Sequence, residues 1–98
     1  MSDSVSSEVK VTHSETARRG MIRIGEIGRM TYTRPCPDVM KVNHTGVDKV
    51  HRGRGLARQM YRAMVEFARQ HQRKVIAVCP FVVAMFEQNP QDQDVLVS

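Results

Sequence analysis

A short run of glycines and arginines, Arg52-Gly53-Arg54-Gly55-Leu56-Ala57, is the part of this sequence best suited to bind a ligand. Glycines let the main chain adopt dihedral angles that a Cβ would forbid, and they let it approach a ligand closely. The first turn of a helix leaves N–H groups unpaired, and these groups favour an anion together with the helix dipole. If a helix begins here, the run predicts a phosphate-binding loop, with Arg52 and Arg54 as cations beside it.

The positive charge of the chain is concentrated around this loop. The formal net charge is +5, whereas residues 49–74 hold eight Lys or Arg and a single acid, which gives +7. Four of these cations recur at helical spacing, and we interpret them as the solvated face of a surface helix. They are Arg58, Arg62, Arg69 and Arg73.

A basic chain also raises the alternative of a nucleic-acid-binding protein, because cations can contact backbone phosphates. Aromatic residues make up only 5% of the sequence and there is no Trp, so base stacking has little support. No nucleic-acid recognition motif is present either. We therefore do not expect nucleic acid as the partner.

Length and cysteine content limit the class of protein further. A chain of 98 residues forms one small domain, and we expect a polar tail over residues 1–7 before a single domain over residues 8–98. Cys36 and Cys79 have no Cys or His neighbours at metal-ligand spacing, so neither a disulfide framework nor a metal site is expected. No leader or bilayer-length apolar run is evident, which favours a cytoplasmic protein without a membrane partner. Exposed edge strands are compatible with a homodimer.

The elements that position the loop follow from hydrophobic periodicity. Alternating residues predict strands before the loop, and in the last of them Met40, Val42 and His44 should share one face. After the loop, helical spacing gives a long helix, and a continuous apolar run then predicts a buried strand parallel to the one before the loop. The predicted ranges are strands at 9–13, 21–26, 27–34, 39–47 and 74–79, helices at 55–71 and 81–88, and a strand or tail at 94–97.

With the strand, loop and helix in place, residues 52–57 resemble the acetyl-CoA signature of the GCN5-related N-acetyltransferases: Gln or Arg, two residues, Gly, one residue, then Gly or Ala. The flanking runs His44-Thr45-Gly46-Val47 and Cys79-Pro80-Phe81 are similar to those of the very short YjdJ-type branch of acetyltransferase-like proteins. The resemblance implies an α/β (α+β) fold, in which a mixed, mostly antiparallel sheet splays one parallel strand pair around CoA. It also implies one long and one short helix.

The resemblance further implies a binding site for acetyl-CoA and an activity, transfer of its acetyl group to an unknown amine. The CoA pyrophosphate would lie on the loop backbone, and the pantetheine arm would pair with the strand before the loop. The thioester would reach the end of the wedge between the two parallel strands. The implied cofactor-binding residues are Thr45, Gly46, Val47, Arg52, Gly53, Arg54, Gly55, Leu56, Ala57, Cys79, Pro80 and Phe81.

Two side chains are candidates for catalysis at the thioester. An unperturbed imidazole titrates near pH ~6.5, so His44 suits general-base work on the amine; the alternative is a histidine hydrogen-bonded into the strand junction. The Cys79 thiol could attack acetyl-CoA and form an acyl-cysteine. Its alternative is a buried, inert small hydrophobe.

The sequence also departs from the family pattern at positions that matter for catalysis. Met85 stands where short relatives carry an aromatic, Gly46 replaces a glutamate, and Asp92 replaces a tyrosine. Neither Tyr32 nor Tyr61 is placed by sequence to protonate the departing thiolate, and Tyr61 lies in the apolar rows of the long helix. A CoA-binding module with weak or no catalysis is therefore the alternative function.

Overall fold

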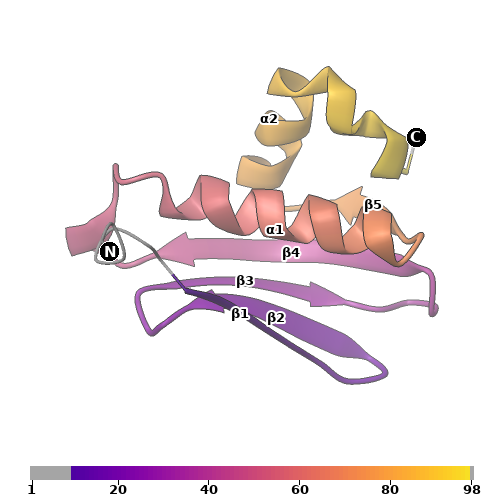
Figure 1. Ribbon diagram of the computed structural model, residues 1–98, viewed down its shortest axis with the longest axis horizontal. Helices are drawn as coiled ribbons and strands as arrows, with labels where there is room; N and C mark the ends of the chain where they lie inside the picture. The colour runs from indigo at the N-terminus through magenta and orange to yellow at the C-terminus, as the bar shows by residue number, and fades with distance from the viewer. Residues whose placement is uncertain (1–9, 98) are drawn as a thin grey trace, which may run out of the picture.

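A five-stranded mixed sheet forms the centre of the computed structural model, which describes residues 10–97 (Figure 1). The predicted tail over residues 1–7 and the predicted domain start at residue 8 lie outside the described residues. None of the described helices combines the length and apolar character needed to cross a bilayer. In chain order the elements are β1 (Val11–Glu15), β2 (Arg19–Ile24), β3 (Gly28–Thr33), β4 (Val39–Val47), the 3-10 helix η1 (Lys49–His51), α1 (Leu56–Gln70), β5 (Lys74–Ala77), α2 (Pro80–Gln88) and the 3-10 helix η2 (Pro90–Val95).

The strands lie in chain order across the sheet, and only β4 and β5 are parallel. This arrangement confirms the predicted fold class, with α1 as the crossover between the parallel pair. β4 matches its predicted bounds, whereas β1 and β2 are shifted toward the turn between them. That turn is tight because the Thr16 hydroxyl accepts hydrogen bonds from the N–H groups of Arg18 and Arg19. The predicted strand or tail at 94–97 is a single parallel bridge between Val75 and Leu96.

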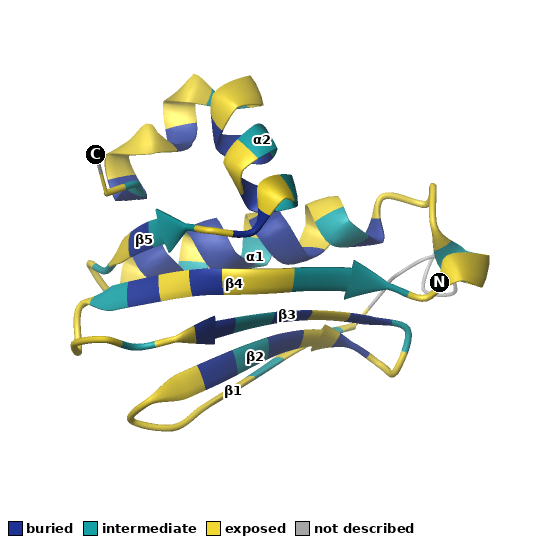
Figure 2. Cartoon of the chain, turned by 180° about the vertical axis from the view of Figure 1, so that it is seen from behind, coloured by how far each residue is buried: buried dark blue, intermediate teal, exposed yellow. Residues whose placement is uncertain are grey.

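Both α-helices pack on the same face of the sheet, and the hydrophobic core lies between these layers. The Tyr61 ring of α1 meets the Phe86 ring of α2 edge-on, with centroids 5.3 Å apart. In Figure 2 the sheet stands in front of α1, and buried and exposed residues alternate along its strands. The fully buried side chains with the largest volumes are Tyr32, Tyr61, Phe86, Ile22, Met30, Met40, Met60 and Met64.

The opposite face of the sheet is not covered by any described element, and we call it the open face. Its side chains are those that alternate with the core residues, and in β1 to β3 they are polar or charged apart from Met21. In β1 to β3 they are Thr12, Ser14, Arg19, Met21, Arg23, Arg29, Thr31 and Thr33.

A β-bulge in β4 changes which of its residues share a face. The register with β3 shifts between Val42 and His44, which leaves Asn43 as an extra residue. Met40 and Val42 are buried beneath α1, whereas His44 is exposed on the open face and Thr45 returns to the α1 side. The prediction that Met40, Val42 and His44 share one face is therefore wrong at His44, because a one-residue insertion reverses the alternation of a strand.

Most of the arginines on α1 are bound to acids that lie far away in the sequence. Arg62 and Arg69 reach the carboxylate of Asp92 at 3.1 and 3.5 Å, and Asp92 is 1% exposed. The Arg73 side chain, 12% exposed, pairs with Glu15 at 2.6 Å. The interpretation of Arg73 as part of a solvated face is therefore wrong, and Arg62 and Arg69 are ion-paired although half-exposed. Consequently α1 does not present a row of unpaired cations to nucleic acid.

Glu15 is the centre of a polar network at the edge of the core. Its carboxylate accepts hydrogen bonds from Arg34 at 2.8 Å, from both terminal nitrogens of Arg73, and from the Tyr32 hydroxyl at 2.6 Å. The same hydroxyl lies 2.6 Å from Nε2 of His13. The network joins β1, β3 and the segment between α1 and β5 through one carboxylate.

This network makes acid lability an expected property of the fold. Hydrogen bonds from Arg73, opposed by burial and assisted by Tyr32, lower the pKa of Glu15 from 4.5 to about 2. Below pH 4.5 the Glu15 carboxylate takes up a proton in the unfolded chain but stays ionised in the folded one. Its contribution to the free energy of unfolding is therefore complete above that pH and is lost as the pH falls toward 2. Urea midpoints measured from pH ~7 to pH ~2 should decrease less steeply with acid for Glu15→Gln than for the wild type.

The exposed Glu87 is the matched control for this measurement. Glu87→Gln should retain the steep acid limb of the wild type, and Glu15→Gln should be the less stable variant at neutral pH. Parallel acid limbs for all three proteins would contradict the assignment to Glu15.

Candidate functional site

The glycine loop ends in a helix start that no side chain caps. Gly55 is the N-cap of α1 with φ +77°, and Gly53 has φ +84°, a left-handed conformation that favours glycine. The first turn of α1 contains no acid, and the N–H groups of Leu56, Ala57 and Arg58 have no partner within the described residues. The start of α1 therefore offers main-chain donors and a positive dipole end to an anion.

A wedge opens beside the loop because β4 and β5 part after a short pairing. The parallel ladder ends at Val42 and Ala77, and the Val42 carbonyl accepts the N–H groups of both Val78 and Cys79, each at 3.1 Å. Pro80 then begins α2 and turns the chain away from β4. On the side of β4 that β5 has left, residues 45–47 have no strand partner among the described residues.

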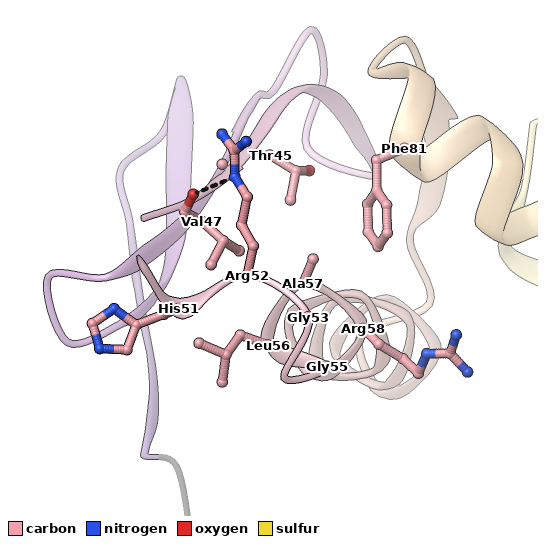
Figure 3. A pocket seen from close by; sticks show the side chains of 11 residues that line it. Thr45, Val47, His51, Arg52, Gly53, Gly55, Leu56, Ala57, Arg58 and Phe81 are labelled. Carbon is pink, nitrogen blue, oxygen red and sulfur yellow. Dashed lines mark hydrogen bonds between the residues drawn. The ribbon is translucent and has the colours of Figure 1, made fainter. Parts of the chain in front are cut away.

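A cavity of about 390 Å³ connects the loop to the wedge (Figure 3). Its walls come from the end of β4, the loop, the first turn of α1 and the start of α2. This volume lies within the usual range for small-molecule sites. The lining residues are Thr45, Gly46, Val47, His51, Arg52, Gly53, Gly55, Leu56, Ala57, Arg58 and Phe81.

Nine of the twelve residues predicted to bind the cofactor line this cavity, and three do not. Arg54 and Pro80 are exposed outside it, and Cys79 is buried behind Thr45. Arg58 lines the cavity although the sequence pattern placed it on a solvated helix face. The feature of the sequence that could have predicted this role is the position of Arg58 within the first helical turn after Gly55. His51 lies beside the loop and also contributes to the lining.

Arg52 ties the loop back to the end of β4. Its Nε donates to the Val47 carbonyl at 3.2 Å, which leaves the terminal guanidinium nitrogens at the cavity (Figure 3). Phe81 faces the same space from α2, and Thr45 and Val47 face it from β4. The site thus has a cationic end at the loop and an apolar wall at the wedge.

Cys79 lies at the N-cap of α2, where its thiol contacts β4. Its Sγ is 3.5 Å from Oγ1 of Thr45, a hydrogen-bonding distance for sulfur, and the residue is 5% exposed. Burial raises the pKa of the thiol, but hydrogen bonding to Thr45 and to the amides of Val82 and Phe81 outweighs it. The net pKa lies below the ordinary value of 9.0. The Cys79 thiol therefore loses its proton more readily than a buried cysteine without these hydrogen bonds would.

His44 lies across β4 from Cys79 and the cavity. Its imidazole folds over Gly46, where a Cβ would come within 3.0 Å of Nε2. A larger residue at position 46 would displace the ring. The structure therefore brings Thr45 and Cys79 together on one side of β4 and places His44 on the open face.

Both tyrosines are engaged elsewhere, as the sequence suggested. The Tyr61 hydroxyl donates to Asp92 at 2.8 Å, and the Tyr32 hydroxyl donates to Glu15. Burial and these hydrogen bonds raise the pKa of each tyrosine far above its ordinary value of 10.0. Neither hydroxyl lines the cavity.

The structure combines a mixed sheet, in which one parallel strand pair splays apart, with a glycine loop that presents unpaired main-chain N–H groups beside the splay, an arrangement suited to an anionic ligand. The family model of the GCN5-related N-acetyl-transferases matches residues 19–95. The chain belongs to this family of acetyltransferases. The narrower resemblance to the YjdJ-type branch stays a prediction.

A solved structure with the same fold supports this assignment. The solution NMR structure of a GCN5-like candidate N-acetyltransferase from Staphylococcus aureus is 27% identical in sequence. The match covers 92% of this chain and 89% of that chain, with a TM-score of 0.69. A comparison with curated proteins finds no match.

Proposed function

We propose that the protein binds acetyl-CoA in the cavity between β4 and α1 and transfers the acetyl group to an amine. The observation that carries the proposal is the continuity of the cavity, from the uncapped start of α1 to Thr45 and Phe81 at the wedge. Acetyl-CoA supplies the activated acyl group when bound. In the family, activity depends on such a cosubstrate, and the residues present here fit it at both ends.

Each end of the cavity would hold a different part of the ligand. The N–H groups at the start of α1, with the guanidinium groups of Arg52 and Arg58, suit the pyrophosphate. The unpaired edge of β4 over residues 45–47 can hydrogen-bond to the amides of the pantetheine arm as a neighbouring strand would. Phe81 covers the arm from α2. The thioester then reaches the level of Thr45 and Cys79.

The environment of Cys79 supports an acyl-cysteine route. The Sγ thiolate attacks the thioester carbonyl, the bond from that carbon to the CoA sulfur breaks, and CoA leaves as a thiolate. The neutral amine then attacks the acetyl-cysteine, the bond from the acetyl carbon to Sγ breaks, and the proton that the nitrogen loses passes to the departing Sγ. Thr45 favours the first step because its hydroxyl stabilises the Cys79 thiolate.

His44 is our candidate for the base that deprotonates the ammonium form of the acceptor before the attack. Its exposed imidazole on the open face can receive that proton, and the neutral amine would then reach the acetyl-cysteine around the edge of β4 that β5 has left. Cys79 would act on the acyl donor and His44 on the acceptor, in separate steps.

Calorimetric titration with CoA and acetyl-CoA, followed by intact mass after incubation with acetyl-CoA, tests the proposal. We expect micromolar affinity, of about −8 kcal/mol, and a gain of one acetyl group by the wild type but not by Cys79→Ala. The lowered pKa of Cys79 predicts that the rate of acetylation reaches half of its maximum at a pH below 9.0.

The exposed Cys36 provides the matched control, since Cys36→Ala should acquire the acetyl group like the wild type. Acetylation of Cys79→Ala alone, or equal acetylation of both variants, would contradict the cysteine route. If neither CoA nor acetyl-CoA binds, the proposed function itself is contradicted. His44→Gln should bind acetyl-CoA normally and form the acetyl-cysteine, yet pass the acetyl group to amines more slowly.

A further inference from the structure

The open face of the sheet carries a second and larger cavity, of about 630 Å³. It lies over the ends of β1, β2 and β3 next to the β1–β2 turn, and it extends to the bulge in β4. Its open-face side chains are hydroxyls, one amide, one thioether and an arginine, contributed by Ser14, Thr31, Thr33, Asn43, Met21 and Arg19. Arg18 adds a second guanidinium at the turn.

The charge of this cavity is positive. Glu15 is the only acid among its lining residues, and its carboxylate is already bound by Arg34, Arg73 and Tyr32 on the core side. Within residues 10–97 neither Arg18 nor Arg19 forms an ion pair or a side-chain hydrogen bond. Two unpaired guanidinium groups above a floor of hydroxyls are a recognition set for an oxyanion.

The cavity extends to the strand position beside the candidate base, although His44 itself does not line it. Thr31 lines it and lies directly opposite His44 in the β3–β4 register. Thr33 lies opposite Arg19 two residues farther along β3, so the two positions are roughly 7 Å apart along the strand. The Asn43 amide, which the bulge exposes on this face, donates to the Thr33 hydroxyl at 3.4 Å. Arg19 and His44 also lie two strands apart, roughly 9.5 Å across the sheet, so only a ligand held by the far end of the long Arg19 side chain and extended over Thr31 would approach both.

We propose that this cavity binds the acceptor, and that the acceptor is a small amine with an oxyanionic group, a phosphate or a carboxylate, a few bonds from its nitrogen. Arg18 and Arg19 hold the anion, the hydroxyls of Thr31 and Thr33 orient it, and the amine points toward His44. The inference rests on the proposed function for the direction of transfer, but the binding site itself does not require acetyl-CoA.

Site-resolved NMR titration of the full chain without acetyl-CoA tests this binding site. Phosphoethanolamine, β-alanine and ethanolamine serve as probes, because they share a primary amine and differ in the anion. We expect the two anionic amines to shift the amides of Thr31, Thr33 and Asn43, and we expect ethanolamine to leave them unchanged. Tighter binding of phosphoethanolamine than of β-alanine would identify a phosphate acceptor, and the reverse order a carboxylate acceptor.

Substitutions distinguish binding at this cavity from binding at the glycine loop of residues 52–57. The double variant Arg18→Gln/Arg19→Gln should weaken the binding of the preferred probe at least tenfold, whereas Arg23→Gln, on the same face outside the cavity, should not. Shifts confined to residues 53–58, equal binding of ethanolamine, or unchanged affinity of the double variant would overturn the proposal.

Titration of the double variant with CoA completes the design. Retained CoA binding together with lost phosphoethanolamine or β-alanine binding is the result that we expect. If CoA fails to bind the wild type while an anionic amine shifts the amide signals of Thr31 and Asn43, the proposed acetyltransferase function is contradicted, and the proposed anion-binding site is supported.

Discussion

Replacement of Gly55 by Val should reduce the affinity for CoA at least ~100-fold. Gly55 is the N-cap of α1 with φ +77°, a conformation that costs a β-branched residue about 1–3 kcal/mol of backbone strain. Beyond its chain neighbours, no described atom lies within 4 Å of the position that a Cβ would take, so the valine side chain would enter the open space beside the loop, where we propose that the pyrophosphate binds. Both effects remove main-chain donors from the ligand without disturbing the core.

The control for backbone strain is Gly25→Val. Gly25 also has a positive φ, +52°, and its Cβ would likewise meet nothing within 4 Å, but it lies in the β2–β3 turn away from the cavity. Calorimetry should show normal CoA affinity for Gly25→Val and little or none for Gly55→Val, with thermal melts of both variants as the measure of folding. Similar CoA affinity in the two variants would show that the loop does not bind the pyrophosphate.

Replacement of Asp92 by Ala should cause the largest loss of stability, about 3 kcal/mol. Asp92 is 1% exposed and binds the Tyr61 hydroxyl at 2.8 Å, Arg62 at 3.1 Å and Arg69 at 3.5 Å. Its removal leaves the buried Tyr61 hydroxyl without an acceptor and releases η2 from α1. For a domain with a total stability of about 5–15 kcal/mol, this is a large fraction.

Asp94, two residues away, provides the comparison. It is exposed and also pairs with Arg69, at 2.7 Å, but it holds no buried group. Thermal melts should show a decrease in Tm of more than ~10 °C for Asp92→Ala and a much smaller decrease for Asp94→Ala. Equal decreases would mean that burial of the Asp92 carboxylate contributes nothing beyond a surface ion pair.

Local sequence patterns determined the elements and the loop. Strand alternation, helical spacing and glycine content depend on residues that are close in sequence, so β4, α1 and α2 were predicted within a residue or so of their observed bounds. The loop of residues 52–57 was recognisable for the same reason, since its conformation depends on its own glycines. The parallel pairing of β4 and β5 followed from the intervening helix.

Tertiary structure alone decided the face of His44 and the partners of the arginines. One inserted residue, Asn43, moves His44 to the open face, and nothing in the local pattern marks a bulge. Asp92 and Glu15 are distant in sequence from the arginines that they bind. The helical spacing of those arginines therefore predicted that they face solvent, whereas the fold brings a carboxylate to each of them. The pKa of Cys79 depends likewise on Thr45, which is 34 residues away in the sequence and which the fold places 3.5 Å from the thiol.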